Sequence, residues 1–513
     1  MKFLRHNWFE FGLLAQIVVG ALMFGIGIGS APFWNDEVTS MSIAERSLGE
    51  IFGLLENTDA NMGSYYVVLK FWTSAASSEP WVRALSAISA LAAIPTTALL
   101  ARRLFGSTTG LVAGFLLAGS MFVVVHAQNA RAYALALFLI TLATLLFVKA
   151  VESGRSTHFF AYGVLSAAAI YASPLSGLVV IAHATTLAFL PQARDQIRPF
   201  AVTYGALLIA LSPLAGLMRA NGTDQLAWIS PASWSAARDI ALETLGGGNE
   251  LLAIAFGALI LIGLIALCRG WNERQTERWR WGRWLVIGWL IFPPVLLYLI
   301  SLEQPLFVAR FLLTSAPAVA IIAAVGVVAL IRRSPAVGTA AIAILVGLAL
   351  IARIESKPYE GGIEGWGQSS WEAGRTIAAQ SKAGDGVLYV SPWQRLPVGW
   401  HLEHEAGADA HLPSDFAIDA TAEELDEIYA REVVAEVLVR RLRHQQRVWL
   451  VSWDWDFAVQ TPVAVAGVPV LESEFRRVRQ YDLGLYRVEL YERDSRTPAN
   501  ALSTRPRSGD DHG

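Results

Sequence analysis

Long apolar segments recur along the first 355 residues, separated by shorter polar stretches. Each is long enough to cross a bilayer as a helix, which needs roughly 17–25 residues and satisfies its own backbone hydrogen bonds in lipid. Over residues 1–355 the pattern predicts a mainly α-helical, polytopic membrane bundle. It has about eleven spans, at residues 8–30, 82–101, 110–127, 132–150, 157–173, 174–191, 199–217, 249–268, 284–302, 310–331 and 335–354.

The polar stretch 31–81 follows the first span and predicts a loop on the outer side of the membrane. Within it, residues 62–78 mix apolar and polar positions. We interpret them as an amphipathic helix that lies in the membrane interface.

Hydropathy falls after Arg353, and residues 356–493 predict a small α/β domain. Tyr486–Tyr491 alternates apolar and polar positions as a strand does, and Val387–Ser391 and Arg447–Trp453 also favour strands. Glu423–Gln445 carries apolar residues at helical spacing and predicts a long helix. Residues 494–513 show no apolar period, and we expect a disordered tail there.

Lys and Arg are concentrated in the loops predicted on the same side of the membrane as the N-terminus. Among them are Arg102, Arg103 and the run Arg269–Arg283. Cytoplasmic loops of membrane proteins carry such an excess. We therefore expect a plasma-membrane protein with a cytoplasmic N-terminus and, after an odd number of spans, an extracytoplasmic C-terminal domain. A span at residues 62–78 would move Arg102 and Arg103 outside, which favours the interfacial helix.

Composition excludes several classes of protein. The chain of 513 residues is 54% hydrophobic and 16% charged, whereas soluble domains average about 45–50% and about 25%. A net charge of −3 leaves no basic surface for nucleic acid. With Cys268 as its one cysteine, the chain forms no intramolecular disulfide and no cysteine-based zinc site.

Two adjacent carboxylates follow the first span, in the segment Phe33-Trp34-Asn35-Asp36-Glu37. At a membrane surface, low dielectric raises the pKa of a carboxylate and a nearby cation lowers it. Such a group can act as a general base on a hydroxyl. Helix capping is the other interpretation: Asn35 or Asp36 would cap a helix from about Val38 to Leu55, and Glu37 would favour its dipole.

Asp59 lies in the same outer loop, just before the amphipathic segment. From the residues alone it fits a second acid, a metal ligand or a helix cap. No histidine-rich or carboxylate cluster with metal-ligand spacing accompanies it, so the sequence gives a divalent metal little support.

Three arginines, Arg83, Arg131 and Arg310, lie near the outer ends of predicted spans. Charges at membrane depth are costly and tend to face a bundle interior or a polar cavity. Guanidinium groups suit phosphate oxygens, so these residues favour an anionic ligand on the side that carries Asp36 and Glu37. Snorkelling to the interface is the alternative for each arginine taken singly.

These motifs, in this order, resemble the GT-C superfamily of integral-membrane glycosyltransferases, and most closely its protein O-mannosyltransferase and aminoarabinose-transferase group. The resemblance covers about residues 8–350. Asn61-Met62-Gly63 stands where relatives carry His-Pro-Pro, so no role is carried over from that histidine. The matching segments are WNDE, TDANMGSYYVVLKFW, WVRALSAISAL, RRLFG, QNARAYAL and FVARFLLTSAP.

The resemblance implies transfer of a sugar from a polyprenyl-phosphate donor to an acceptor hydroxyl on the outer face, with inversion at the anomeric carbon. Mannose is the first expectation for the sugar, and a pentose such as arabinose is the second. The acceptor would be a protein, a lipid or a glycan, and a divalent metal is an option but not a certain cofactor.

The family also implies roles for single residues. Asp36 carries over as the catalytic base, Glu37 as a residue that holds the site or orients the acceptor, and Asp59 as an auxiliary acid or metal ligand. The substrate-binding candidates on the phosphate side and in the QNARAYAL segment are Arg83, Gln128, Arg131, Tyr133 and Arg310.

Two other functions fit parts of the pattern. A transporter or flippase for a lipid-linked sugar would use the arginines to bind phosphate but would not need Asp36 as a base. A non-catalytic scaffold would tolerate the loss of Asp36, Arg131 and Arg310 together. Transporters often show paired halves with interrupted helices, and we find no such halves here.

Overall fold

The computed structural model describes residues 7–58, 61–190, 193–221, 229, 231–269, 277–355, 363–407, 411–453 and 460–494. The chain forms two compact units. The first, here called the membrane unit, comprises Met1–Ala31 and Ser40–Lys357. The second, the C-terminal unit, comprises Pro32–Thr39 and Pro358–Gly513.

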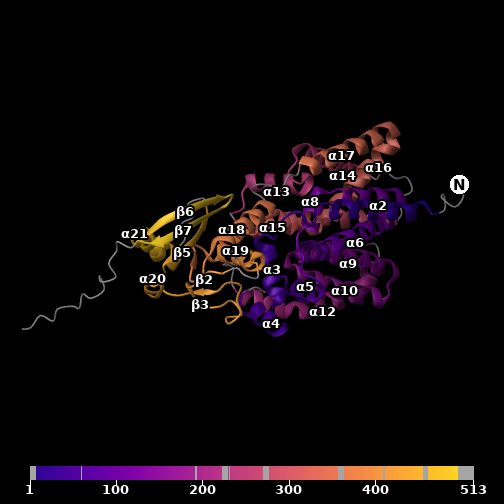
Figure 1. The fold of residues 1–513 in the computed structure, drawn as a ribbon. Coiled ribbons are helices and arrows are strands. Elements are labelled where there is room, and N and C mark those ends of the chain that lie inside the picture. Colours follow the sequence, from indigo (N-terminus) through magenta and orange to yellow (C-terminus); the bar gives the residue numbers. More distant parts are fainter. Residues whose placement is uncertain are drawn as a thin grey trace, which may run out of the picture. The chain divides into compact units, whose positions relative to one another are not determined.

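The membrane unit is a bundle of helices (Figure 1). Helix α3 (Asn35–Glu45) begins in the segment that belongs to the C-terminal unit and continues into the membrane unit. The other elements are α2 (Trp8–Gly25), α4 (Leu48–Asn57), α5 (Gly63–Thr73), α6 (Glu79–Phe105), α7 (Ser107–Ala118), α8 (Met121–Ala127), α9 (Tyr133–Ser153), α10 (Ser156–Ala172), η1 (Pro174–Ser176), α11 (Gly177–Thr186), η2 (Leu187–Phe189), α12 (Ala193–Ala220), α13 (Trp234–Gly246), α14 (Glu250–Arg269), α15 (Glu277–Ile300), η4 (Ala309–Ser315), α16 (Ala316–Arg333) and α17 (Pro335–Glu355).

The helical membrane fold is confirmed, but the number of spans is smaller than the eleven expected. Among the described residues, eight helices are long and apolar enough to cross a membrane, or nine if α7 and α8, bent by 57°, form one span. The other two expected spans correspond to α10, with 17 residues, and to the short apolar stretch Pro174–Phe189. Proline at 174 lacks the backbone N–H that a continuous helix would use there.

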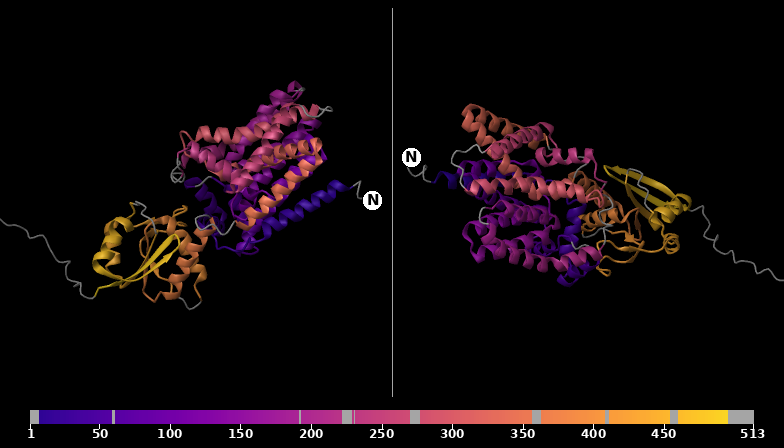
Figure 2. Two further views of the ribbon diagram at one scale, coloured as in Figure 1. Left: turned by 90° about the horizontal axis from the view of Figure 1, so that it is seen from above. Right: turned by 180° about the vertical axis from the view of Figure 1, so that it is seen from behind.

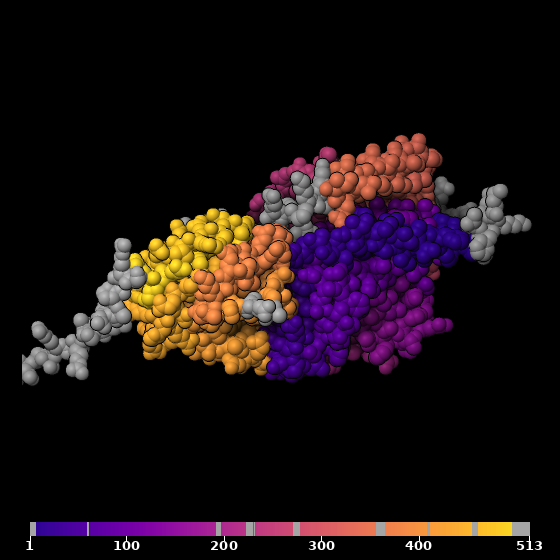
Figure 3. Space-filling model, in the orientation of Figure 1, coloured from indigo at the N-terminus to yellow at the C-terminus, as the bar shows by residue number. Residues whose placement is uncertain are grey.

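Burial distinguishes the centre of the bundle from its rim. The span that includes α16 is 83% buried, whereas those of α2 and α17 are 22% and 17% buried. Figure 3 shows α2, in indigo, along the surface of the unit. Glycines let α16 approach α14: a Cβ at Gly326 would lie 2.2 Å from the Leu259 carbonyl oxygen, and one at Gly263 would lie 2.0 Å from that of Ile322. Small residues at membrane helix interfaces permit this close packing.

The polar loop folds into short helices. Helix α5, with 11 residues, is far too short to span, as the sequence predicted for this segment. The single helix expected from Val38 to Leu55 is wrong. Two helices occur instead, because Ser47 forms a capping box with Glu50 and begins α4.

The C-terminal unit contains a five-stranded sheet in the order β2-β1-β5-β7-β6 (Figure 2). Strand β1 is parallel to β2 and β5, and β7 is antiparallel to β5 and β6. The small sheet of β3 and β4 is antiparallel. The elements are α18 (Ile363–Gln380), β1 (Gly386–Tyr389), α19 (Pro392–Glu405), β2 (Ser414–Asp415), β3 (Ile418–Ala420), β4 (Arg431–Glu432), α20 (Ala435–Leu442), β5 (Arg447–Trp453), η5 (Val463–Gly467), α21 (Val468–Glu474), β6 (Phe475–Leu483) and β7 (Tyr486–Arg493).

Both faces of this sheet are covered. Val387 and Trp449 pack in one apolar core with residues of α18 and α19, whereas Leu388 and Leu450 pack in a second core with residues of α20 and α21. Alternate strand residues point to opposite faces, so these apolar runs read as buried strands. The α/β character is confirmed, and β1, β5 and β7 lie where the sequence placed strands.

One element of this unit was predicted wrongly. The long helix expected over Glu423–Gln445 is reduced to α20, with turns and β4 before it. The tail prediction, residues 494–513, lies outside the described residues except for Asp494.

Candidate functional site

The two adjacent carboxylates lie in the first turn of α3 and have different surroundings. Glu37 is 1% exposed, and its Oε2 accepts a hydrogen bond from the Trp34 backbone N–H at 3.4 Å. The Trp34 carbonyl accepts the first helical hydrogen bonds, so Trp34 is the N-cap and Glu37 provides the reciprocal half of a capping box. Asp36 is half-buried and is not the cap. The capping interpretation therefore describes Glu37, not Asp36 or Asn35.

The segment that carries Asp36 is held by α18 and α19 of its own unit. His401 Nε2 lies 2.9 Å from the Phe33 carbonyl oxygen, and His401 is 3% exposed. A Cβ at Gly367 would lie 2.5 Å from the Pro32 carbonyl oxygen, so only glycine permits this approach. No sequence pattern predicts these contacts, because they join residues more than 330 positions apart.

In the membrane unit, Arg131 is positioned between two elements. Its Nη1 donates to Ser40 Oγ at 3.2 Å, and its backbone carbonyl accepts from Ser86 Oγ at 3.2 Å. Arg131 ends a short loop before α9, where Asn129 O accepts from its backbone N–H. The guanidinium is thus directed toward the part of α3 that follows the two carboxylates in the sequence.

Two other candidates bind backbone carbonyls. Arg83 is 4% exposed, and its Nη1 donates to the carbonyls of Ile28 and Ala31 at 3.0 and 2.8 Å. Gln128 Nε2 donates to the carbonyls of Phe24 and Ile26 at 2.9 and 2.7 Å. Because the last carbonyls of a helix lack partners within it, these side chains stabilise the end of α2 and the chain beyond it. Their roles toward substrate stay predictions.

Arg310 and Tyr133 belong to one aromatic cluster, in which Tyr133 is buried and Arg310 and Phe311 are half-buried. The Arg310 guanidinium carbon lies 5.8 Å from the Phe311 ring centre, and the Phe311 ring lies 6.3 Å from that of Tyr133. Tyr133 also contacts His126, with ring centres 5.6 Å apart. The structure therefore brings Arg310 and Tyr133, nearly 180 positions apart in sequence, into one cluster.

Glu243, in α13, is an acidic neighbour of this cluster that the sequence analysis did not single out. The residue is exposed at the surface, but partial desolvation raises the pKa of its carboxyl group, and the charge of Arg310 opposes that shift. The only sequence signal was an acidic residue in a helix of a predicted outer loop, which is not distinctive.

A metal site finds no support in the described part of the chain. Asp59 lies outside the described residues, and within them no three His, Cys, Asp or Glu side chains are grouped to hold a metal ion. The His-Pro-Pro motif of relatives is also structurally excluded here. Met62 has φ +64°, a left-handed conformation that proline cannot adopt.

Comparison with known proteins adds the family context. A family model described as dolichyl-phosphate-mannose-protein mannosyltransferase matches residues 65–218. No curated protein matches the chain in sequence. Among solved structures, ArnT from Cupriavidus metallidurans bound to undecaprenyl phosphate aligns with a TM-score of 0.57 at 13% identity, over 93% of this chain and 97% of that one. The chain has the GT-C fold.

A second GT-C structure aligns over almost the whole chain. It is the archaeal oligosaccharyltransferase AglB from Archaeoglobus fulgidus in complex with an inhibitory peptide and a dolichol-phosphate. The TM-score is 0.51 at 12% identity, over 97% of this chain and 75% of that one. The family match in the GT-C fold runs from α5 to α12 and includes Arg83, Gln128, Arg131 and Tyr133.

Proposed function

We propose that this protein is a membrane glycosyltransferase that uses a polyprenyl-phosphate sugar as donor and a hydroxyl as acceptor. The observation that carries the proposal is the division of roles between two adjacent carboxylates on a GT-C fold. Glu37 is buried and caps α3, while half-buried Asp36 is not the cap. An acid in such a position is suited to accept a proton.

The similar proteins support a lipid-linked donor. One solved structure contains undecaprenyl phosphate, another contains a dolichol-phosphate, and the matching family is described by dolichyl-phosphate-mannose. We propose mannose as the sugar on this family description. Transfer takes place on the outer face of the plasma membrane, with the N-terminus in the cytoplasm.

The proposed reaction is a single in-line displacement. Asp36 accepts the proton of the acceptor hydroxyl as its oxygen forms a bond to the anomeric carbon. The bond from that carbon to the phosphate oxygen breaks, and the polyprenyl phosphate leaves with the electron pair. Inversion follows because attack and departure occur on opposite faces. Positioned cations stabilise the negative charge that develops on the leaving phosphate.

We assign that role to Arg131 and Arg310, with Tyr133 beside Arg310. Within the membrane unit, Ser40 Oγ of α3 accepts the hydrogen bond from Arg131. Arg83 and Gln128 hold the chain between α2 and α3 and stay candidates for substrate binding. Asp59 stays a candidate auxiliary acid.

The test is a transfer assay with the purified full-length protein, a radiolabelled polyprenyl-phosphate mannose and an extract of cell-envelope acceptors. Label must appear in acceptor and free polyprenyl phosphate must be released in equal amount. Asp36→Asn must abolish both. Movement of intact donor across vesicle membranes without release of polyprenyl phosphate, and equal in wild type and Asp36→Asn, would instead establish a flippase.

A further inference from the structure

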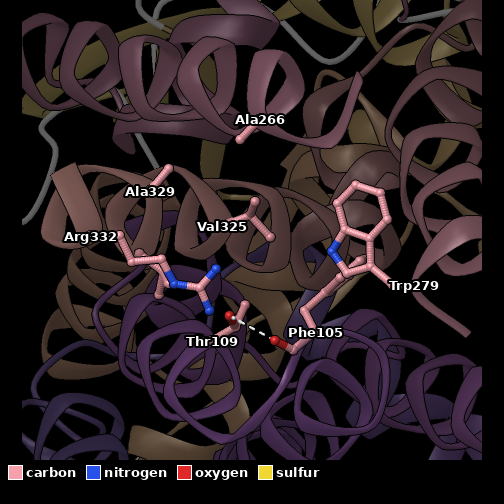
Figure 4. Close-up of a pocket in the computed structure, with 8 residues that line it drawn as sticks. Phe105, Thr109, Ala266, Trp279, Val325, Ala329 and Arg332 are labelled. Carbon is pink, nitrogen blue, oxygen red and sulfur yellow. Dashed lines mark hydrogen bonds between the residues drawn. The ribbon is translucent and has the colours of Figure 1, made fainter. Parts of the chain in front are cut away.

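A hollow lies in the membrane unit, near the ends of five helices. It is formed by Phe105 of α6, Thr109 of α7, Ala266 of α14, Trp279 of α15 and four residues of α16. The α16 residues are Val325, Val328, Ala329 and Arg332. Figure 4 shows the Arg332 guanidinium beside Thr109, with the indole of Trp279 on the other side. Its walls are thus apolar and its polar groups are gathered near one end.

The hollow lies at the opposite end of α6 from Arg83. Phe105 follows Arg83 by 22 residues in this helix, which corresponds to about 33 Å at about 1.5 Å per residue. That length matches the hydrocarbon thickness of a bilayer, about 30 Å. Arg83 belongs to the predicted outer side of the membrane. The hollow therefore lies in the headgroup layer of the opposite leaflet. The distribution of Lys and Arg assigns that leaflet to the cytoplasmic side.

Positively charged side chains outnumber negatively charged ones around the end of α6 that lines the hollow. Glu152 pairs with both Arg103 and Arg278, at 2.5 Å each. The guanidinium of Arg283 stacks over Trp279, 5.7 Å from the ring centre, and its Nη1 donates to the Leu267 carbonyl. Within the described part of the chain, Arg332 forms no ion pair with an acidic residue.

The size of the hollow also limits the size of the ligand group that it binds. Its cavity volume is about 30 Å³, the space of roughly two or three water-sized probes. A phosphate group fits that scale. The apolar residues Phe105, Val325 and Val328 line the remainder, so acyl chains can continue from the phosphate along the helices.

We infer that this hollow is a binding site for an anionic phospholipid of the inner leaflet. The lipid phosphate lies against Arg332, with the Trp279 indole at the level of the headgroup. Basic pockets between membrane helices on the cytoplasmic side bind acidic lipid headgroups in this way, and tryptophan concentrates at that depth. The site is separate from the proposed transferase site and does not depend on it.

The test is native mass spectrometry of the full-length protein in detergent, with phosphatidylglycerol or phosphatidylcholine added. We expect phosphatidylglycerol to be retained preferentially. Arg332→Ala should lower that retention about fivefold, the value of one cation at an anionic headgroup layer. The matched control is Arg333→Ala, which removes the same charge from the next position, outside the lining residues. A thermal unfolding curve for each variant shows that the bundle is folded.

Equal retention of the two lipids would overturn the proposal, as would equal losses in Arg332→Ala and Arg333→Ala, since general attraction would then suffice. Competition with inorganic phosphate is a further measurement. If it displaces phosphatidylglycerol at millimolar concentration, the site binds the free anion and the lipid assignment is wrong. Preferential retention that depends on Arg332 and resists inorganic phosphate would support the lipid assignment.

Discussion

Four arginines, two from each unit, have different partners. In the C-terminal unit, Arg395 binds the carboxylates of Asp415 and Glu432 at 2.7 and 2.8 Å, and Arg447 binds that of Asp385 at 2.9 Å. In the membrane unit, Arg83 binds backbone carbonyls and Arg131 binds a serine hydroxyl. The residue type is the same, but the partner decides what its loss does to the molecule.

The comparison of these arginines shows at which positions a substitution can change ligand binding without changing stability. Removing an arginine from a buried ion pair leaves carboxylates buried without a cation, which is strongly destabilising. Removing one that contacts a hydroxyl leaves a small polar group that is readily satisfied. A variant of Arg131 should therefore report on function, and a variant of Arg395 should report on folding.

The largest expected effect concerns the adjacent acids in α3. Asp36→Asn should lower the transfer rate by about 10²–10⁴-fold, because general-base catalysis contributes that much, with little change in thermal unfolding. Glu37→Ala should instead lower the free energy of unfolding by about 1 kcal/mol, as loss of a cap does. Rates and melting curves of both variants check this. If Asp36→Asn instead lowered stability and Glu37→Ala instead lowered the transfer rate, Glu37 would be the base and Asp36 the stabilising residue.

The arginine comparison itself gives the next effect. Arg131→Ala should lower kcat/KM roughly 10- to 100-fold, the value of a charge-assisted hydrogen bond of about 1.5–3 kcal/mol, and leave the fold intact. Arg395→Ala should destabilise the C-terminal unit by about 3–5 kcal/mol. Steady-state kinetics and chemical unfolding of both variants distinguish these results. Unfolding of Arg131→Ala to the same extent would break the distinction between the units.

A smaller effect is expected for the residue that holds the segment before α3. His401→Ala leaves the buried Phe33 carbonyl without its ring partner, at a cost of about 1–3 kcal/mol, and should lower the transfer rate several-fold. His404→Ala is the control, since His404 is exposed and both its hydrogen bond and its ring contact are with Trp400, one turn away. Melting temperature and rate are measured together. Identical behaviour of the two variants would remove the positioning role.

The smallest effect is a pH dependence in the membrane unit. Because partial desolvation raises the pKa of Glu243 above its ordinary value of 4.5, the folded state binds its proton more tightly than the unfolded state. Its contribution to stability is fully present below pH 4.5 and is lost as pH rises through the raised value. Thermal unfolding of wild type and Glu243→Gln from pH 4 upward measures this. The variant should show the shallower decline, and parallel curves would contradict the assignment.

The sequence by itself determined the helical membrane fold, the strands β1, β5 and β7, and the absence of a span at α5. These features depend on local hydrophobic periodicity and on the cost of unpaired backbone groups in lipid, which neighbouring residues specify. The same periodicity was insufficient for Glu423–Gln445. Apolar residues at helical spacing there are divided among turns, β4 and α20, since packing on the sheet outweighs local preference.

Only the tertiary structure decided which polar residue does what. Glu37 and Asp36 are neighbours of one chemical type, and Arg83 and Arg131 are equally arginines, yet carbonyls, hydroxyls and caps supplied by distant segments give them different surroundings. His401 contacts Phe33, hundreds of positions earlier in the chain. The charge of Arg310 acts on Glu243, tens of positions away. A pattern read along the chain contains the residue types but not the partners, and the partners set the charge, burial and reactivity of each group.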